Sequence, residues 1–361
     1  MPHPLDLDDL RSRVQDRIDA ELDRWEVELA EVGPEVADLT TPVRTLLRGG
    51  KRLRAGFAYW GWRAAGRDDH EGAISLAASM ELFQAAALIH DDVMDDSETR
   101  RGQPATHRAL SRAHAERAWH GDPDHFGVAG AILAGNLCLG WCDDLYAGSG
   151  LPPEALAVAR PAFERMRGQL MAGQFLDIVT SMRPWHQLAD DARVDQARHV
   201  ITYKSAKYSI EHPLLIGATA GGLGPSDLAA LSRYGVALGV AFQLRDDVLG
   251  VFGDPDVTGK PAGDDLREGK RTVLIARTLA GADDVSTTRV DQWLGARDLT
   301  SSEVESFRAL IVDTGALEGV EADISHGAET ARAALAEATG VAEPARRVLD
   351  ELIELTTARS T

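Results

Sequence analysis

The chain contains only two cysteines among its 361 residues, which excludes a disulfide framework and a cysteine-rich zinc site. They are Cys138 and Cys142, four positions apart and therefore on one face of a helix. We expect two buried structural thiols there, because free cysteine is among the residues most often found inside proteins.

Positive charge is also scarce, with 38 Lys and Arg against 57 Asp and Glu and a net charge of −19. This balance argues against nucleic acid and anionic membrane as partners. We find no apolar run of 18 residues, so we expect no transmembrane segment. The opening residues, MPHPLDLDDLRSRV, are acidic and lack the apolar stretch of a signal peptide. Together these absences predict a cytoplasmic protein.

Alternation of apolar and polar residues, the mark of a half-buried strand, is rare, and helical spacing dominates. Apolar residues recur every three or four positions between charges in 5–32, whereas 72–90 is apolar on every side. The second pattern predicts a buried helix. We therefore expect an all-α fold, and 44% apolar residues suffice for a large core.

The most informative stretch is HDDVMDD at 90–96, which directly follows the apolar helix. On a helix, Asp91 and Asp95 lie one turn apart on the same face, where like charges repel. The negative end of the helix dipole adds to this repulsion. A hard divalent cation removes both penalties, and Mg²⁺ typically combines one or two carboxylates with water and substrate phosphates. The cluster therefore predicts a magnesium–phosphate site rather than a solvated helix end.

A second acidic pair repeats this pattern in RDDVLG at 245–250, where Asp246 and Asp247 follow another apolar helix. Each of the two helices also contains a glutamine, Gln84 in the first and Gln243 in the second. Two sets of carboxylates favour a diphosphate carried by several metal ions, because bound metals invert the local charge.

Basic residues gather at Gly-rich turns beside the acidic stretches, where Arg grips phosphate as a fork and Lys as a point charge. No Walker A sequence is present, because Lys51 is followed by Arg52 in helical surroundings. H-E-x-x-H and G-x-S-x-G patterns are absent as well. The candidate phosphate-binding residues are Lys51, Arg52, Arg54, Arg100, Arg101, Lys204, Lys207, Lys260, Lys270 and Arg271.

Five stretches in order resemble the trans-isoprenyl diphosphate synthases, also called the polyprenyl synthetase family. They are GGKRLR, ELFQAAALIHDDVMDDSETRRGQPATH, GQFLDI, YKSAKYS and AFQLRDDVLGVFGDPDVTGKPAGDDLREGKRT. The sequences of these motifs are most similar to those of actinobacterial geranylgeranyl and farnesyl diphosphate synthases. The resemblance implies one all-helical domain over residues 1–361, an isoprenoid synthase-type bundle around a deep central cavity, although length alone favours two domains. It also implies a homodimer.

The reaction that the resemblance implies is the condensation of isopentenyl diphosphate with an allylic diphosphate, with release of pyrophosphate. Three Mg²⁺ ions are expected, held by Asp91, Asp95 and Asp246, with Asp92 and Asp247 beside these ligands. Metal ions and cationic side chains would stabilise the charge that develops on the departing diphosphate. No protein base is evident, so the released pyrophosphate is expected to take the proton.

The remaining polar residues receive roles from the same resemblance, residue by residue. The isopentenyl diphosphate site is implied to contain Lys51, Arg54, Gln84 and Arg101. The allylic diphosphate site is implied to contain Arg100, Lys204, Lys260 and Lys270. Ser205, where the family usually has Thr, and Gln243 are implied near the reacting carbons, with Gln174 and Asp177 as supporting residues.

The second motif departs from the family pattern DDxxD, because Gly250 replaces the third aspartate. Asp254, four residues later, is a candidate replacement. The departure leaves open a non-catalytic partner subunit of a heteromeric prenyltransferase. A terpene cyclase also uses DDxxD, but it needs no isopentenyl diphosphate site such as Lys51, Arg54 and Arg101 would form.

Product length depends in this family on the residues that precede the first motif. Ala87 and Ala86 are small, whereas members that make fifteen-carbon products often carry aromatics there. Phe83 lies one turn deeper, about 5.4 Å or one isoprene unit further. We therefore expect a geranylgeranyl, twenty-carbon product, with farnesyl or longer polyprenyl diphosphate as alternatives. If Phe83 faces a neighbouring helix instead, a longer product would follow.

Overall fold

The computed structural model describes residues 4–253 and 263–357, and helices form nearly all of this part of the chain. The all-α expectation is therefore confirmed. The described chain divides into two compact units. Unit 1 comprises residues 1–161, 213–223 and 342–345, and unit 2 comprises 162–212, 224–341 and 346–361. The single helical domain inferred from the sequence stays a prediction.

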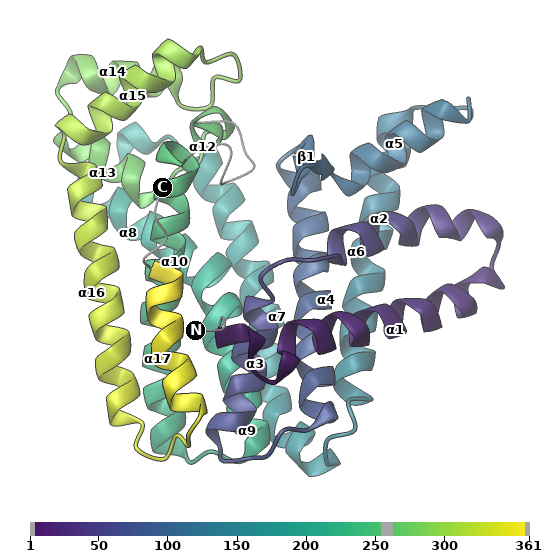
Figure 1. The fold of residues 1–361 in the computed structure, drawn as a ribbon. Coiled ribbons are helices and arrows are strands. Elements are labelled where there is room, and N and C mark those ends of the chain that lie inside the picture. The colour runs from purple at the N-terminus through teal and green to yellow at the C-terminus, as the bar shows by residue number, and fades with distance from the viewer. Residues whose placement is uncertain (1–3, 254–262, 358–361) are drawn as a thin grey trace. The chain divides into compact units, whose positions relative to one another are not determined.

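Unit 1 is built from the N-terminal helices and a short hairpin of strands β1 and β2 (Figure 1). Its elements are η1 (Pro4–Asp9), α1 (Leu10–Ala30), η2 (Pro34–Val36), α2 (Ala37–Leu47), α3 (Leu53–Ala64), α4 (Glu71–Met94), β1 (Thr99–Arg100), β2 (Gln103–Pro104), α5 (Thr106–Glu116), α6 (Pro123–Ala147) and most of α9 (His212–Gly221). Helix α4 is its central element and packs against α3 and α6.

Unit 2 contains most of the C-terminal half of the chain, and α10 packs along α16 within it (Figure 1). Its elements are most of α7 (Pro153–Met182), η3 (Trp185–Gln187), α8 (Asp190–Val200), η4 (Ile201–Glu211), α10 (Pro225–Phe252), α12 (Asp264–Glu268), α13 (Val273–Gly281), α14 (Asp284–Trp293), α15 (Ser301–Asp313), α16 (Ala316–Glu337) and α17 (Ala345–Thr357). One apolar core joins α10, α13, α15 and α16.

Helix α4 is the buried helix that the sequence predicts, and its start is defined by a local cap. The side chain of His70 accepts a hydrogen bond from the Gly72 amide, which satisfies one of the free N–H groups of the first turn. Nearly every residue from Gly72 to Phe83 is buried. Because all sides of this segment are apolar, it is stable only when it is surrounded by other elements.

Two helices are long and apolar enough to cross a membrane by length and composition alone, contrary to the expectation that no such run exists. They are α4 and α6. The apolar window of α4 is 89% buried inside the protein, as a core helix would be, whereas that of α6 is 39% buried. The two cysteines lie on α6, and both are buried as predicted.

Candidate active site

Several side chains in the C-terminal half of α4 are accessible in unit 1, and four of the accessible residues lie on one helical face. Gln84, Leu88 and Asp91 are partly accessible and Asp95 is exposed, while most of their neighbours are buried. The spacing of four, three and four residues places these side chains on one helical face. The prediction that Asp91 and Asp95 share a face is therefore confirmed, and Gln84 lies on the same face two turns earlier. Leu88, between them, was not singled out from the sequence.

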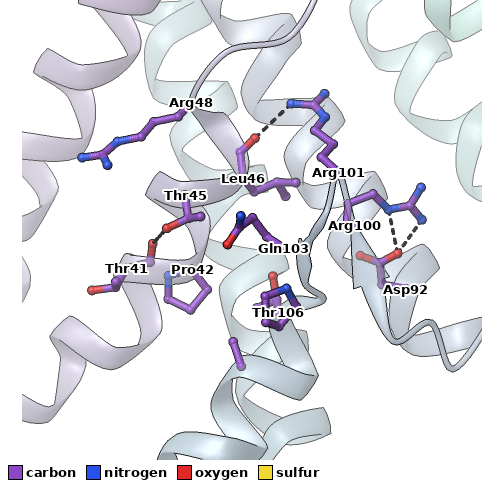
Figure 2. Close-up of a pocket in the computed structure, with 12 residues that line it drawn as sticks. Thr41, Pro42, Thr45, Leu46, Arg48, Asp92, Arg100, Arg101, Gln103 and Thr106 are labelled. Atoms are coloured by element: carbon purple, nitrogen blue, oxygen red, sulfur yellow. Dashed lines mark hydrogen bonds and ion pairs between the residues drawn. The ribbon is translucent and has the colours of Figure 1, made fainter. Parts of the chain in front are cut away.

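Asp92 points the other way and is only 1% exposed. It accepts a hydrogen bond from Arg100 Nε at 2.8 Å and a second from Arg100 Nη2, as Figure 2 shows. Burial raises the pKa of Asp92, and Arg100 opposes this shift. Arg100 Nη2 also lies 3.5 Å from Asp91 Oδ2. Arg100 therefore holds the buried Asp92 in place and neutralises part of the charge of the first acidic cluster.

The hairpin that follows brings Arg101 to the GGKRLR loop. Arg101 has a φ of 54°, and the next residue, Gly102, has a φ of 72°, so both adopt the left-handed conformation of a tight turn. The Arg101 guanidinium donates to the Leu46 carbonyl at 3.1 Å (Figure 2). It also lies over Gly50, where a Cβ would stand 3.1 Å from Arg101 Nη1. Two basic motifs about fifty residues apart thus meet within unit 1.

A pocket opens beside this hairpin, between it, α2 and the start of α5 (Figure 2). Arg48, Arg100 and Arg101 line it together with Asp92 and with the polar side chains of Thr41, Thr45, Gln103 and Thr106. Three guanidinium groups in one pocket favour an anionic ligand. Of the residues that the resemblance assigns to diphosphates, Arg100 and Arg101 line this pocket, whereas Lys51, Arg54 and Gln84 do not.

In unit 2 the lysines of the YKSAKYS stretch lie on η4, which is an 11-residue π-helix. π-Helical turns are rare and frequently occur at functional sites. Lys204 Nζ donates to Asp177 Oδ2 of α7 at 2.6 Å, so Asp177 holds this lysine in place. Lys207 instead donates to Glu211 at 2.7 Å within the same element. Ser205 is partly accessible one position after Lys204.

The π-helix lies unusually close to its neighbours, and glycines make this possible. A Cβ at Gly173 of α7 would stand 2.7 Å from the Lys204 amide nitrogen. A Cβ at Gly239 of α10 would stand 2.6 Å from Ala206 Cα. Contacts under 3.0 Å force a backbone shift, so these two glycines allow the wider helix to pack between α7 and α10.

The second acidic pair lies near the end of α10. Asp246 is partly accessible, whereas Asp247 is only 6% exposed and accepts a hydrogen bond from Gln243 Nε2 at 2.9 Å. Burial raises the pKa of Asp247 to about 8, with nearby Asp265 adding to the effect. Gln243 therefore orients the buried carboxyl, and Asp246 is the member of the pair that a ligand can reach.

Gly250 is explained by its neighbour. A Cβ at this position would stand 1.9 Å from Asp265 Oδ2 of α12, so no larger residue fits without moving that side chain. Asp265 is 8% exposed and accepts from Lys270 Nζ at 2.9 Å, and Glu268 accepts from the same ammonium. Although burial acts to lower it, these two carboxylates raise the pKa of Lys270 above its usual range. The position of the missing third acid is thus occupied by an acid from another helix.

Several predicted residues have a different place from the one expected, or none that the structure describes. Arg52 is only 4% exposed and pairs with the buried Glu81, so it is not available to a phosphate. Arg271 lies with its guanidinium 5.3 Å from the ring centre of Trp185. Lys260 and Asp254 lie outside the described residues.

The donor sets fit Mg²⁺ bound with a substrate better than a metal held by protein alone. Among residues 4–253 and 263–357, no group of three or more His, Cys, Asp or Glu side chains is arranged to hold a metal ion by itself. Mg²⁺ commonly uses one or two carboxylates and completes its shell with water and phosphate oxygens. Asp91 with Asp95, and Asp246 alone, supply ligands of this kind.

Three comparisons with known proteins agree with this arrangement. A family model described as polyprenyl synthetase matches residues 36–311. The chain is 32% identical over 310 residues to a geranylfarnesyl diphosphate synthase of Aeropyrum pernix, covering 85% of this chain and 89% of that one. It is 32% identical over 269 residues to a geranylgeranyl diphosphate synthase of Mycobacterium tuberculosis, covering 74% and 69%. Among solved structures, a geranylgeranyl pyrophosphate synthase of Corynebacterium glutamicum, complexed with isoprenyl diphosphate and magnesium, is 41% identical with a TM-score of 0.92, covering 99% of this chain and 100% of that one.

Proposed function

Because the chain belongs to the polyprenyl synthetase family, a family of metal-dependent prenyltransferases, we propose that it condenses isopentenyl diphosphate with an allylic diphosphate to make geranylgeranyl diphosphate. The observation that carries this proposal is that each unit contains both an accessible aspartate and a cation fixed by a carboxylate. Asp91 is accessible beside Arg100 in unit 1. Asp246 is accessible in unit 2, where Lys204 donates a hydrogen bond to Asp177.

The chain's own residues divide the work between two diphosphates. Lys51, Arg54, Gln84 and Arg101 bind the isopentenyl substrate, and Arg101 is already held against the GGKRLR loop. Arg100, Lys204 and Lys270 hold the allylic diphosphate, each oriented by a carboxylate partner. Ser205 follows Lys204 in the chain, and Gln243 precedes Asp246 by three residues. Holding two substrates in reacting orientation supplies a large part of the rate enhancement.

Asp91, Asp95 and Asp246 would hold Mg²⁺, for which we propose three ions in each active site. When bound, these ions supply Lewis-acid stabilisation of the charge that forms on the departing diphosphate. The proposal gives the acidic cluster of each unit a part in metal binding. Asp92 and Asp247 serve as buried supports rather than ligands, since Arg100 and Gln243 already occupy them.

The geranylgeranyl product rests on small residues next to Asp91 on α4. Ala86 and Ala87 are both buried and leave room for a growing chain, while Phe83 is the first large side chain below them. Phe83 shares a helical face with His90, seven residues later, whose ring lies against Gly135 of α6. This shared face is the basis of the alternative hypothesis, in which Phe83 packs on a neighbouring helix and does not form the floor of the product cavity.

Replacement of Phe83 by Ala separates the two alternatives for product length. If Phe83 is the floor, Phe83→Ala extends the main product beyond twenty carbons, read by chromatography of the dephosphorylated alcohols. Unchanged product length would rule out Phe83 as the floor. Leu82→Ala, a neighbouring buried residue on another face of α4, is the matched control for loss of core volume.

A homodimer in the cytoplasm is the assembly and location that we propose. Helix α6 exposes Ile132 and Leu133, at 44% and 56%, although its residues are apolar enough for a protein interior. Adjacent exposed apolar side chains on a long helix are typical of an interface between subunits. Leu133→Glu should shift the sedimentation coefficient toward that of a monomer, whereas a dimeric Leu133→Glu protein would exclude this face.

A product assay on the purified chain tests the proposed activity. Labelled isopentenyl diphosphate is incubated with dimethylallyl, geranyl or farnesyl diphosphate in turn, with and without Mg²⁺. We expect Mg²⁺-dependent elongation to a twenty-carbon product from each primer. Consumption of an allylic diphosphate without isopentenyl diphosphate would instead identify a cyclase. Absence of turnover with every primer would favour a partner subunit of a heteromeric enzyme.

A further inference from the structure

The GGKRLR loop is held in a conformation that its sequence does not favour. Gly49 and Gly50 have φ values of 71° and 97°, and Arg52 has a φ of 52°. A left-handed conformation is unfavourable for a residue with a side chain, so surrounding contacts must hold Arg52 in place. Lys51 lies between Gly50, which adopts this conformation freely, and the strained Arg52, and Arg54 follows in the first turn of α3. The direction of both side chains depends on the loop.

Glu81, on α4, holds the GGKRLR loop in this conformation. One carboxylate oxygen accepts from Arg52 Nη1 at 3.0 Å, and the other accepts from the Ala55 amide at 3.2 Å. Glu81 and Arg52 are 3% and 4% exposed. The same side chain thus neutralises the buried guanidinium and caps the N-terminus of α3, where free amides and the helix dipole favour a negative charge.

Gln15, on α1, fixes the same loop from a second side. Its side-chain oxygen accepts from the Gly49 amide at 3.3 Å and from Arg52 Nη2. Arg52 Nη2 also donates to the Leu47 carbonyl at the end of α2. The Arg52 guanidinium therefore joins α1, α2 and α4, and the loop that carries Lys51 closes around it.

Glu81 also provides negative charge beneath a group of cations. Arg101, Arg52 and Arg54 are close enough to influence each other electrostatically, and Glu81 opposes their mutual repulsion at Arg101. The Arg101 guanidinium lies directly on Gly50 of the loop. Without a buried carboxylate here, the cations would separate, since like charges in a medium of low polarity repel strongly.

From these contacts we propose that Glu81 is a positioning residue for isopentenyl diphosphate. Through Arg52 and the first turn of α3, it sets Lys51, Arg54 and Arg101 in the arrangement that grips the diphosphate of this substrate. The inference rests on the proposed function and assigns to Glu81 no contact with substrate. It predicts a selective effect on one of two substrates, which loss of fold stability cannot produce.

The test is steady-state kinetics of Glu81→Gln with each substrate varied in turn. We expect KM for isopentenyl diphosphate to rise about tenfold or more, because small misplacements of binding groups have effects of this size. KM for the allylic diphosphate should stay within about twofold by the same argument. A uniform loss of kcat with both KM values unchanged would indicate a merely structural role and overturn the proposal.

Glu21→Gln is the matched control. Glu21 is also a buried glutamate, 3% exposed, and it accepts from Arg17 and from the Trp25 indole far along α1 from the loop. This variant should lower stability without changing either KM. If Glu21→Gln raised KM for isopentenyl diphosphate as much as Glu81→Gln, the selective role of Glu81 would be excluded.

Gln15→Leu provides a second route if Glu81→Gln does not fold. It removes the hydrogen bonds to Gly49 and Arg52 and leaves the ion pair intact, so a smaller rise in the same KM is expected. Calorimetric titration of isopentenyl diphosphate alone, without a primer, measures the same site without turnover. Weaker binding in the variants supports positioning by Glu81 and Gln15 even if the wild-type chain proves inactive. Unchanged binding in a folded variant overturns the inference while leaving the proposed activity standing.

Discussion

The acidic clusters of α4 and α10 share one plan and differ in how it is completed. In each, the first aspartate, Asp91 or Asp246, is accessible, and the second, Asp92 or Asp247, is buried with a hydrogen-bond partner. The partner is the cation Arg100 in the first cluster and a neutral amide in the second. The first cluster continues along its own helix to Asp95.

The second cluster cannot continue in this way. Its corresponding position is Gly250, and the space beside it is filled by Asp265 from α12. The comparison shows that the two aspartates of a DD pair differ in their surroundings: the outer one is accessible to a ligand, and the inner one is buried with a hydrogen-bond partner. It also teaches that a motif read along one helix can be completed by a residue from another segment.

Removal of the outer aspartates should have the largest effect. Asp91→Asn and Asp246→Asn are each expected to lower turnover by about a hundredfold or more, because each would remove a carboxylate proposed to hold the metal ions that stabilise the leaving diphosphate. The Mg²⁺ concentration for half-maximal rate should rise in both. Asp23→Asn, an exposed aspartate of α1, is the control that leaves turnover unchanged.

Near-normal turnover in either outer-aspartate variant would break the comparison. It would mean that only the more sensitive cluster takes part in turnover.

Substitution of Gly250 should have the next largest effect. Gly250→Ala is expected to lower the free energy of unfolding in urea by about 2–3 kcal/mol, because overpacking costs this much. Gly250→Asp should cost more, since it adds a carboxylate beside Asp265. Gly168→Ala, in α7 with nothing within 4 Å of its Cβ, should instead raise the free energy of unfolding by up to about 1 kcal/mol.

The double variant Gly250→Asp/Asp265→Gly returns the third acid to α10 and makes the second cluster resemble the first. It should be more stable than Gly250→Asp alone. A double variant no more stable than the single one would show that Asp265 is not the obstacle at this position.

The inner aspartates should have the smallest effects and should differ from each other. Asp92→Asn replaces the charged acceptor of the Arg100 hydrogen bonds by a neutral one and should lower the free energy of unfolding by about 1.5–3 kcal/mol, the range for hydrogen bonds to charged groups. Asp247→Asn keeps an oxygen that accepts from the Gln243 amide, so the free energy of unfolding should change by less than about 1 kcal/mol. Equal losses in urea unfolding would contradict the contrast between a charged and a neutral partner.

The sequence predicted the parts of this site that depend on one helix. Apolar residues on all sides of 72–90 indicated a buried α4, and helical spacing placed Asp91 and Asp95 on one face, because both follow from the pitch alone. The cations of GGKRLR could not be sorted in this way. Arg52 resembled Lys51 and Arg54, and only its contact with Glu81, twenty-nine residues away, distinguishes the buried guanidinium.

The π-helix and the role of Asp265 were also beyond the sequence. The segment from Ile201 to Glu211 has ordinary helical composition, and its wider turns depend on the backbones of α7 and α10 approaching at Gly173 and Gly239. Asp254 is the first acid after Gly250 along the chain, whereas Asp265 is the acid in contact with it. Sequence distance misled here because the contact joins separate helices.

The contact between Gly250 and Asp265 also restricts the order in which the chain can change. A single substitution that restores an aspartate at position 250 meets Asp265 and should be selected against, and loss of Asp265 first removes a partner of Lys270. A change from an acid at position 265 to an acid at position 250 would then have to pass through intermediates of lower fitness. We expect the two positions to vary together or not at all.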